Sequence, residues 1–270
     1  MPSKSGAPSQ IWTSIGLSFR QIFAIVDADM RKVRHDPYEL IWRMVQPAIW
    51  LLIFGEAMAN AKAIPTPGLS YLDYIAPGIL AQSILFLSIF FSISLIWERD
   101  AGILHKVLVT PAPRYTLVVG RSMAAGMRSL PQIVVIYALT FFLGVNLNWH
   151  PMAIILVIIF SLLGAGVFST FSLIIAVIVK RRERFLGIGQ LMTMPLFFAS
   201  NALYPIAIMP PWIRTFSLLN PLTYQVDALR SLMINGQVSH FGLGVDFCVG
   251  ISVYLVLVCI ATYLYPRILY

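Results

Sequence analysis

Six long apolar stretches constrain the fold of this chain more than any other feature. About 20 residues of α-helix are needed to cross roughly 30 Å of hydrocarbon. We therefore expect an all-α integral membrane protein with six transmembrane helices, folded as a single transmembrane domain over residues 1–270. The six stretches are residues 44–63, 74–97, 129–149, 151–179, a segment that starts near Phe185, and 247–266.

The composition supports a membrane protein and excludes other classes. Of the 270 residues 59% are hydrophobic and 11% are charged, against about 25% charged in soluble domains. The net charge of +8 does not indicate nucleic acid as a partner, because the basic residues lie between apolar stretches and not on a soluble face. Apart from Glu56, no ionisable residue lies in a span core, which argues against an ion-coupled carrier and against an intramembrane enzyme.

The distribution of lysine and arginine predicts the orientation in the membrane. Loops that are translocated to the non-cytosolic side of the membrane contain few lysine and arginine residues. With six spans, sixteen of the 19 lie on the side of both termini, so we expect a multi-pass protein with both termini in the cytosol. The three on the other side are Lys62, Arg214 and Arg230.

The segment before the first span has the pattern of an amphipathic helix. Apolar residues recur there at steps of three and four, which places them on one helical face. We expect an interfacial helix over residues 10–36, which either anchors the chain or moves with a cytosolic partner. The apolar positions are Ile11, Ile15, Phe19, Ile22, Val26, Met30 and Val33.

The connector between the second and third spans, residues 98–114, is unusually polar for this chain. It lies within the sequence WERDAGILHKVLVTPAPR, which begins at Trp97. Glu98 and Asp100 precede a short apolar face, as suits the N-terminus of a helix, and two prolines end it. The pattern predicts either a small docking helix outside the bilayer or an ordinary solvated loop.

Residues 205–236, between the last two spans, are apolar but contain prolines too often for one straight helix. We expect two short helices that re-enter the outer leaflet, the second capped by Asn220 and started by Pro221. Asp227 and Arg230 lie three residues apart on it and are expected to pair. The alternative is that they contact a substrate.

Aromatic and polar residues on the second and fifth spans are candidates for a substrate path. The alternative for each is plain helix packing or lipid contact. The candidates are Phe86, Phe90, Phe197, Phe198, Asn201 and Tyr204.

The connector and the later sequence NPLTYQVDALR, residues 220–230, together resemble the type-2 ABC transporter permeases, in particular the daunorubicin-resistance and nodulation-factor exporter branch. The resemblance implies a multi-pass protein of the bacterial inner membrane whose connector is a coupling helix that docks on a separate ATP-binding subunit. Asp100 replaces the usual Glu of that motif, and Ile103 the usual Thr. The implied docking residues are Glu98, Arg99, Asp100, Gly102, Ile103, Leu104, Val107 and Leu108.

The resemblance also implies an outer gate and an assembly. The re-entrant helices close the outer end of the path, and the permease pairs with a second copy of itself or with a related permease. The implied gate residues are Asn220, Pro221, Tyr224, Asp227 and Arg230.

The sequence contains no G-x-x-x-x-G-K-[ST] phosphate loop, so we expect no cofactor on this chain, with ATP and Mg on the partner subunit. The expected function is non-enzymatic: export of a hydrophobic or amphiphilic cargo such as a drug or a lipid. A lipid-linked saccharide or lipo-oligosaccharide is the alternative cargo, and a scaffold or lipid scramblase is the alternative function.

Overall fold

The computed structural model describes residues 7–35, 38–61, 64–66, 68–102, 113–179 and 181–265. Within these ranges the chain is helical, and the one isolated β-bridge joins Leu147 to Ile234. The all-α prediction is therefore confirmed. In order the helices are α1 (Ala7–His35), α2 (Tyr38–Ile49), the π-helical η1 (Trp50–Gly55), α3 (Glu56–Ala61), α4 (Tyr71–Phe91), α5 (Ile93–Asp100), α7 (Arg114–Phe142), α8 (Pro151–Val179), α9 (Arg182–Phe198), the 3₁₀ turn η2 (Ile206–Ile208), α10 (Pro211–Leu219), α11 (Pro221–Met233) and α12 (Leu243–Leu264).

Four helical segments of the described chain are long and apolar enough to cross a membrane. They are the continuous run of α4 and α5 (Tyr71–Asp100), α7, α8 and α12. Helix α8 has the bounds predicted for the fourth span, whereas α7 begins fifteen residues before its predicted span. The protein is an integral membrane protein.

The other two predicted spans coincide with helices of a different kind. Of the predicted span 44–63, residues 44–61 fall on α2, η1 and α3, where the helix changes from α to π at Trp50, and residues 62–63 lie outside the described residues. Pro47, just before this change, has no N–H to donate to the carbonyl four residues earlier. The fifth predicted span is α9, which has only 17 residues and contains Pro195 near its end.

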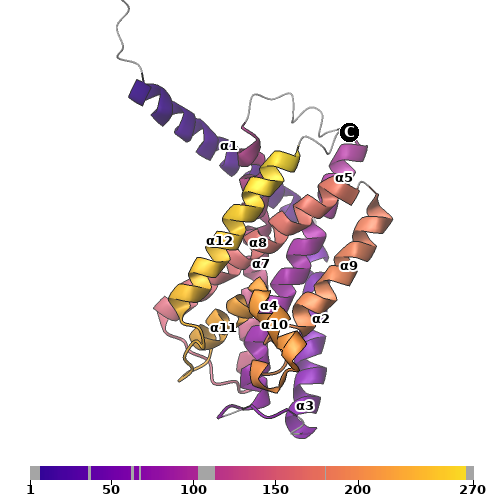
Figure 1. Cartoon of the computed structure of the whole chain (residues 1–270), viewed down its shortest axis with the longest axis vertical. Coiled ribbons are helices and arrows are strands. Elements are labelled where there is room, and N and C mark those ends of the chain that lie inside the picture. The colour runs from indigo at the N-terminus through magenta and orange to yellow at the C-terminus, as the bar shows by residue number, and fades with distance from the viewer. Residues whose placement is uncertain are drawn as a thin grey trace, which may run out of the picture.

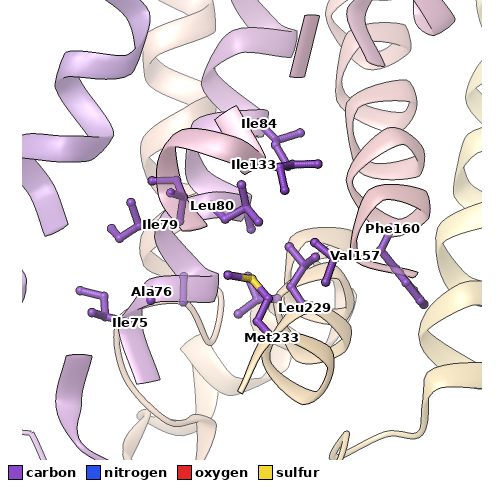
Figure 2. Packing of buried hydrophobic residues seen from close by; sticks show 14 of the residues in the cluster. Ile75, Ala76, Ile79, Leu80, Ile84, Ile133, Val157, Phe160, Leu229 and Met233 are labelled. Carbon is purple, nitrogen blue, oxygen red and sulfur yellow. The ribbon is translucent and has the colours of Figure 1, made fainter. Parts of the chain in front are cut away.

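Helix α4 is the centre of the bundle. In the run of α4 and α5, 78% of an 18-residue apolar stretch is buried. Helices α2, α7, α8, α9 and α11 all pack against α4. Figure 2 shows Leu80 of α4 on the side of Leu229 and Met233 of α11, and Ile75 and Ile79 on the other side of α4. A helix that is apolar all round must be buried on all sides or face lipid, and α4 is the buried case.

Helix α12 is the opposite case. The mean hydropathy of its apolar stretch is 2.4, close to the 2.3 of the run of α4 and α5, yet only 6% of that stretch is buried. It lies on the outside of the bundle in Figure 1, where it is yellow. Because hydrocarbon does not penalise exposed apolar side chains, this surface suits a membrane.

The two ends of the bundle differ. At the top of Figure 1 lie α1, the end of α5 and the C-terminal end of α12, and we call this the α5 end. At the bottom lie α3 and α10, and we call this the α10 end. There the turn between α7 and α8 is tied to the end of α11, since Asn148 N donates to the Met233 carbonyl at 2.7 Å and Asn235 N to the Asn146 carbonyl at 3.1 Å.

The predicted pair of short helices between α9 and α12 is present as α10 and α11. Asn220 caps α11 as predicted, because its side chain accepts a hydrogen bond from Leu222 N at 3.0 Å. Pro221 follows as the first helical residue, where its missing N–H costs nothing.

The predicted interfacial helix is α1, and from Leu17 onward its side chains show two surroundings. Ile25 lies against Gly120 of α7, where a Cβ atom would come within 2.9 Å of the Ile25 side chain. Phe19 and Phe23, one turn apart, are exposed. The helix therefore packs on the bundle with one face and leaves aromatic side chains on another, as an interfacial helix would.

The close approach of α4 to the turn after α9 gives a test of the packing. A Cβ atom on Gly78 would overlap the backbone carbonyl of Ala202. We expect Gly78→Ala to lower the free energy of unfolding by about 1–3 kcal/mol, as overpacking does. The midpoint of thermal unfolding in mild detergent measures this.

Gly187→Ala is the matched control, because Gly187 is on exposed α9 surface and a Cβ there meets nothing within 4 Å. Alanine should leave the midpoint unchanged or raise it, since glycine inside a helix costs about 0.5–1 kcal/mol relative to alanine. Equal midpoints for the two variants would contradict the packing described.

Candidate functional site

Glu98, in the last turn of α5, connects three helices at the α5 end. Its carboxylate accepts a hydrogen bond from Lys32 Nζ of α1 at 3.0 Å and another from Arg121 Nη2 of α7. Glu98 is the first residue of the connector, and residues 103–112 of the connector lie outside the described residues. Glu98 therefore joins the start of the connector to α1 and to α7, the helix that follows the connector in the sequence.

The two partners of Glu98 differ in strength. The Lys32 side chain is 60% exposed, and an ion pair so open to water contributes at most about 1 kcal/mol. The side chains of Arg121 and Glu98 are only 15% and 17% exposed. Removing one partner from such a largely buried pair leaves an uncompensated charge, at a cost of about 3–5 kcal/mol when burial is complete. Arg121 is therefore the dominant partner.

A second ion pair fixes α1 on α7. Arg128 Nε and Nη2 donate to the two carboxylate oxygens of Asp29 at 2.7 and 3.0 Å. Both side chains are nearly nine-tenths buried, and the guanidinium carbon of Arg128 lies 4.9 Å from the ring centroid of Phe91. Since Arg121 and Arg128 lie seven residues apart on one face of α7, α1 is held at two points.

The predicted docking residues can now be placed. The carboxylate of Glu98, the first of the implied docking residues, accepts hydrogen bonds from Lys32 and Arg121 of this chain. Arg99 pairs with Asp100 at 2.9 Å, and Gly102 has the left-handed φ of +70° that often follows the end of a helix. Four of these residues lie outside the described part of the chain: Ile103, Leu104, Val107 and Leu108.

At the α10 end a buried arginine joins three segments. Arg230 Nη2 of α11 donates to the carbonyl of Asn201, in the turn after α9, at 2.8 Å and to the carbonyl of Tyr74 of α4 at 3.3 Å. Its guanidinium carbon is 3.8 Å from the Tyr74 ring centroid. The Tyr74 hydroxyl donates to the same Asn201 carbonyl at 2.9 Å. We call Arg230, Tyr74 and Asn201 the Arg230 clasp.

The expected ion pair between Asp227 and Arg230 is not formed. Asp227 instead accepts hydrogen bonds from Ser239 Oγ at 2.9 Å and from Phe241 N at 3.0 Å, both in the segment before α12. The Arg230 guanidinium donates instead to the backbone carbonyls of Tyr74 and Asn201. The spacing of Asp227 and Arg230 on the helix therefore did not predict the partner of either residue. Burial lowers the pKa of Arg230, while Tyr74 and Asp227 favour its charged form.

The remaining predicted gate residues have structural contacts. Asn220 Nδ2 donates to the Leu196 carbonyl at the end of α9 at 2.7 Å. The Tyr224 hydroxyl donates to the Leu218 carbonyl of α10 at 2.8 Å. Together with Pro221 at the start of α11, they fix α10 and α11 to each other and to α9.

The predicted substrate path divides into three places. Phe86 and Phe90 line a cavity of about 190 Å³ between α2, α4, α7 and α9. Phe197 is fully buried in the core, with its ring 5.4 Å from that of the exposed Phe198. Asn201 belongs to the Arg230 clasp. The Tyr204 hydroxyl donates to the Phe198 carbonyl at 2.6 Å.

Sequence reasoning missed two sets of residues. The spacing of Arg121 and Arg128, opposite Asp29 and Lys32 on α1, was a signal that could have been used. The second set gave no such signal, because it consists of neutral amides on four separate helices. These glutamines, all lining the cavity, are Gln46, Gln82, Gln132 and Gln190.

Comparison with known proteins finds one family and several relatives. Residues 20–234 match the family described as ABC-2 type transporter. The chain is 30% identical to the ycf38 protein of Cyanophora paradoxa, over 79% of this chain and 74% of the relative. It is 25% identical to the daunorubicin resistance ABC transporter permease protein DrrB1 of Streptomyces coeruleorubidus, over 82% and 77%. It is also 25% identical to the inner membrane transport permease YadH of Escherichia coli K12, over 78% and 82%.

The attachment of α1 to α7 generates a matched pair of substitutions. Asp29→Asn removes the charge from a largely buried pair, which should cost up to about 3–5 kcal/mol. Asp27→Asn removes the charge from an exposed pair with Arg31 one turn along the same helix, worth about 0.3–0.5 kcal/mol. Hydrogen exchange of α1 in lipid nanodiscs should accelerate strongly for Asp29→Asn only. Similar exchange in both variants would show that α1 is not held by Arg128.

Proposed function

Because the chain belongs to the ABC-2 type transporter family, we propose that it is the membrane permease subunit of an ATP-driven exporter. Its cargo is hydrophobic or amphiphilic, drug-like or lipid-like. The named activity of the DrrB1 relative, daunorubicin resistance by an ABC transporter, supports export. The permease itself does no chemistry, and ATP and Mg bind to a separate subunit.

The proposed topology has six spans, with α2–η1–α3 and α9 as the two beyond the four long apolar helices. Both termini and the α5 end face the cytosol, in line with the excess of lysine and arginine there. Helices α10 and α11 re-enter from the opposite side. The inner membrane named for the YadH relative is the proposed location.

The observation that carries the proposal is the position of Glu98. It ties the start of the connector to α1 and to α7, the helix that follows the connector in the sequence. In the proposed mechanism the ATP-binding subunit presses on the connector and α1. Because Glu98, Lys32 and Arg121 hold these parts together, the movement passes to α7 and α4 as one unit.

The Arg230 clasp is the proposed outer gate. It holds α11 against α4 and the turn after α9 through backbone carbonyls, with Asp227 held separately by the segment before α12. Tilting α4 would strain these contacts and release cargo. A second copy of the chain, or a related permease, completes the transporter, with cargo moving at the seam between them.

Two alternatives remain as outcomes of the tests. A lipid-linked saccharide or lipo-oligosaccharide is the alternative cargo. A scaffold or scramblase is the alternative function, and it requires no ATP-binding partner.

The coupling role predicts a specific defect in Glu98→Gln. The permease is purified from its native host with its ATP-binding subunit and reconstituted in liposomes, and ATP hydrolysis by the complex is measured. We expect the subunit to be retained and hydrolysis to fall about tenfold, which corresponds to about 1.4 kcal/mol. Asp100→Asn, two residues away and paired only with its neighbour Arg99 among the described residues, should stay within twofold.

Other outcomes of this experiment are informative. Normal hydrolysis by Glu98→Gln would refute the coupling role. Loss of the subunit from this variant would make Glu98 a docking contact, and absence of any ATP-binding subunit with the wild type would favour the scaffold or scramblase.

The topology predicts which single cysteines are accessible from outside. In a background with Cys248→Ser and Cys259→Ser, a membrane-impermeant thiol reagent applied to whole cells should label Arg214→Cys. It should label Arg182→Cys only after the cells are permeabilised. The reverse pattern would invert the proposed orientation.

A further inference from the structure

Two buried aspartates share one serine hydroxyl where α11 meets the start of α12. Ser239 Oγ lies 2.9 Å from Asp227 Oδ2 of α11 and 2.8 Å from Asp246 Oδ2 in the first turn of α12. The two aspartates are only 5% and 2% exposed. Gly242 N donates to the same Ser239 Oγ at 2.7 Å. We call Asp227, Ser239 and Asp246 the aspartate bridge.

The aspartate bridge lacks one hydrogen atom if both carboxyl groups are ionised. A serine hydroxyl has one hydrogen to donate and two lone pairs to accept with, whereas an ionised carboxylate can only accept. The Ser239 hydroxyl could then donate to one aspartate only, and its oxygen would face an oxygen of the other with no hydrogen between them. Two contacts of less than 3 Å therefore require an additional proton, held by Asp227 or by Asp246.

The repulsion between the two carboxyl groups leads to the same requirement. Both Oδ2 atoms lie within 2.9 Å of Ser239 Oγ, so they are less than about 6 Å apart, a distance at which one carboxylate disfavours the charge of another. Burial adds to this effect, because a charged group loses its hydration. A single proton on the pair removes the repulsion.

The surroundings of the two aspartates assign this proton to Asp246. Asp227 Oδ2 accepts a further hydrogen bond from Phe241 N at 3.0 Å, and Arg230 lies one turn along the same helix. Both suit a negative charge on Asp227. Asp246 Oδ1, in contrast, is buried without a hydrogen-bond partner among the described residues. An ionised Asp246 would leave this oxygen charged and unpaired, which is the costlier arrangement.

With the proton on Asp246, every group on the serine oxygen has a partner. Asp246 Oδ2 donates to Ser239 Oγ, and the Ser239 hydroxyl donates to Asp227 Oδ2. Gly242 N donates to the second lone pair of the serine oxygen. The chain of hydrogen bonds then runs without interruption from α12 to α11.

Other ionisable side chains around the aspartate bridge come from α4, α10, α11 and the segment before α12. They are Tyr74, Arg214, Tyr224, Arg230 and His240. Only His240 among them normally titrates between about pH 5 and pH 8, and it is exposed. Helix α8, which packs against both α11 and α12, contains no ionisable residue. The charged residues of α7 lie at or before its midpoint, away from this end: Arg114, Arg121 and Arg128.

We propose that the aspartate bridge is a proton-binding site that fixes α12 to α11 while it is protonated and releases it as the pH rises. An aspartate in water loses its proton near about pH 4, whereas the closed bridge holds one. A rise in pH therefore favours the open state, which binds fewer protons. Because α11 carries Arg230, the proton decides whether α12 moves together with the Arg230 clasp. The bridge forms within one chain, so it operates whether or not the proposed export function holds.

The test measures hydrogen exchange of the full-length permease in lipid nanodiscs between about pH 5 and about pH 9. Results are compared as protection factors, which remove the intrinsic pH dependence of exchange. The reporters are the N–H groups of Phe241 and Gly242, which donate to Asp227 and Ser239. Their protection should fall at least tenfold over this range in the wild type. In Asp246→Asn the side-chain amide donates to Ser239 as the protonated acid does, so protection should stay high at every pH.

Two control variants separate the aspartate bridge from other titrating groups. His240→Gln removes the neighbouring histidine, and Asp73→Asn removes an aspartate of α4 that accepts from Asn146 N at 3.1 Å. Both should keep the pH dependence of the wild type. Asp227→Asn serves if Asp246→Asn does not fold. The Ser239 hydroxyl can then donate to an ionised Asp246 without an additional proton, so the pH dependence should again be lost.

Three outcomes in the exchange data would overturn the proposal: protection independent of pH in the wild type, a pH dependence that persists in Asp246→Asn, or one that disappears in His240→Gln. Replacing sodium by choline at constant pH and ionic strength gives a fourth. Loss of protection without sodium would mean that the two aspartates hold a cation and not a proton. Because the assay needs no ATP-binding subunit, its failure leaves the permease function standing.

Discussion

The ion pair between Glu98 and Arg121 is the interaction on which the arrangement of the α5 end depends. Both groups are withdrawn from water, so neither can lose the other without leaving a poorly compensated charge in a largely apolar site. Lys32 links α1 to this pair, but its exposed ion pair with Glu98 contributes little to the free energy of folding. The Arg128–Asp29 pair lies two turns further along α7, about 10 Å away at 1.5 Å per residue. With two attachments α1 cannot rotate on α7 without breaking one of them.

The rest of the bundle can be understood from α4, which has two different faces. One face packs its aliphatic side chains against α8 and α11 (Figure 2) and forms the continuous core. The other face carries Gln82, Phe86 and Phe90 and borders the cavity. The helices that border this second face, α2, α7 and α9, each contain a proline in their interior, as α4 itself does. At the α10 end the Arg230 clasp holds α4 in place through backbone carbonyls.

Much of the fold could be predicted because its signals are local. Helix α8 matches its predicted span at both ends, and the Asn220–Pro221 cap follows from two adjacent residues. The partners of Glu98, Asp227 and Arg230 could not be predicted in this way, because they come from segments up to 156 residues away in the chain. The cavity glutamines are neutral, lie on four helices and have no common spacing. The resemblance implies that Glu98 docks on another subunit, and the structure adds the contacts of its carboxylate with Lys32 and Arg121 of this chain, which the sequence did not predict.

The most direct test of the coupling account is a charge exchange within the pair. Glu98→Arg, Arg121→Glu and the double variant are each purified with the ATP-binding subunit, and ATP hydrolysis in liposomes is compared. If Glu98 acts through Arg121, each single variant is defective and the double variant recovers a large part of wild-type hydrolysis, because the attraction is restored with its signs reversed. If the double variant is as defective as Glu98→Arg alone, the essential partner of Glu98 lies elsewhere, and the coupling account presented for the α5 end is wrong.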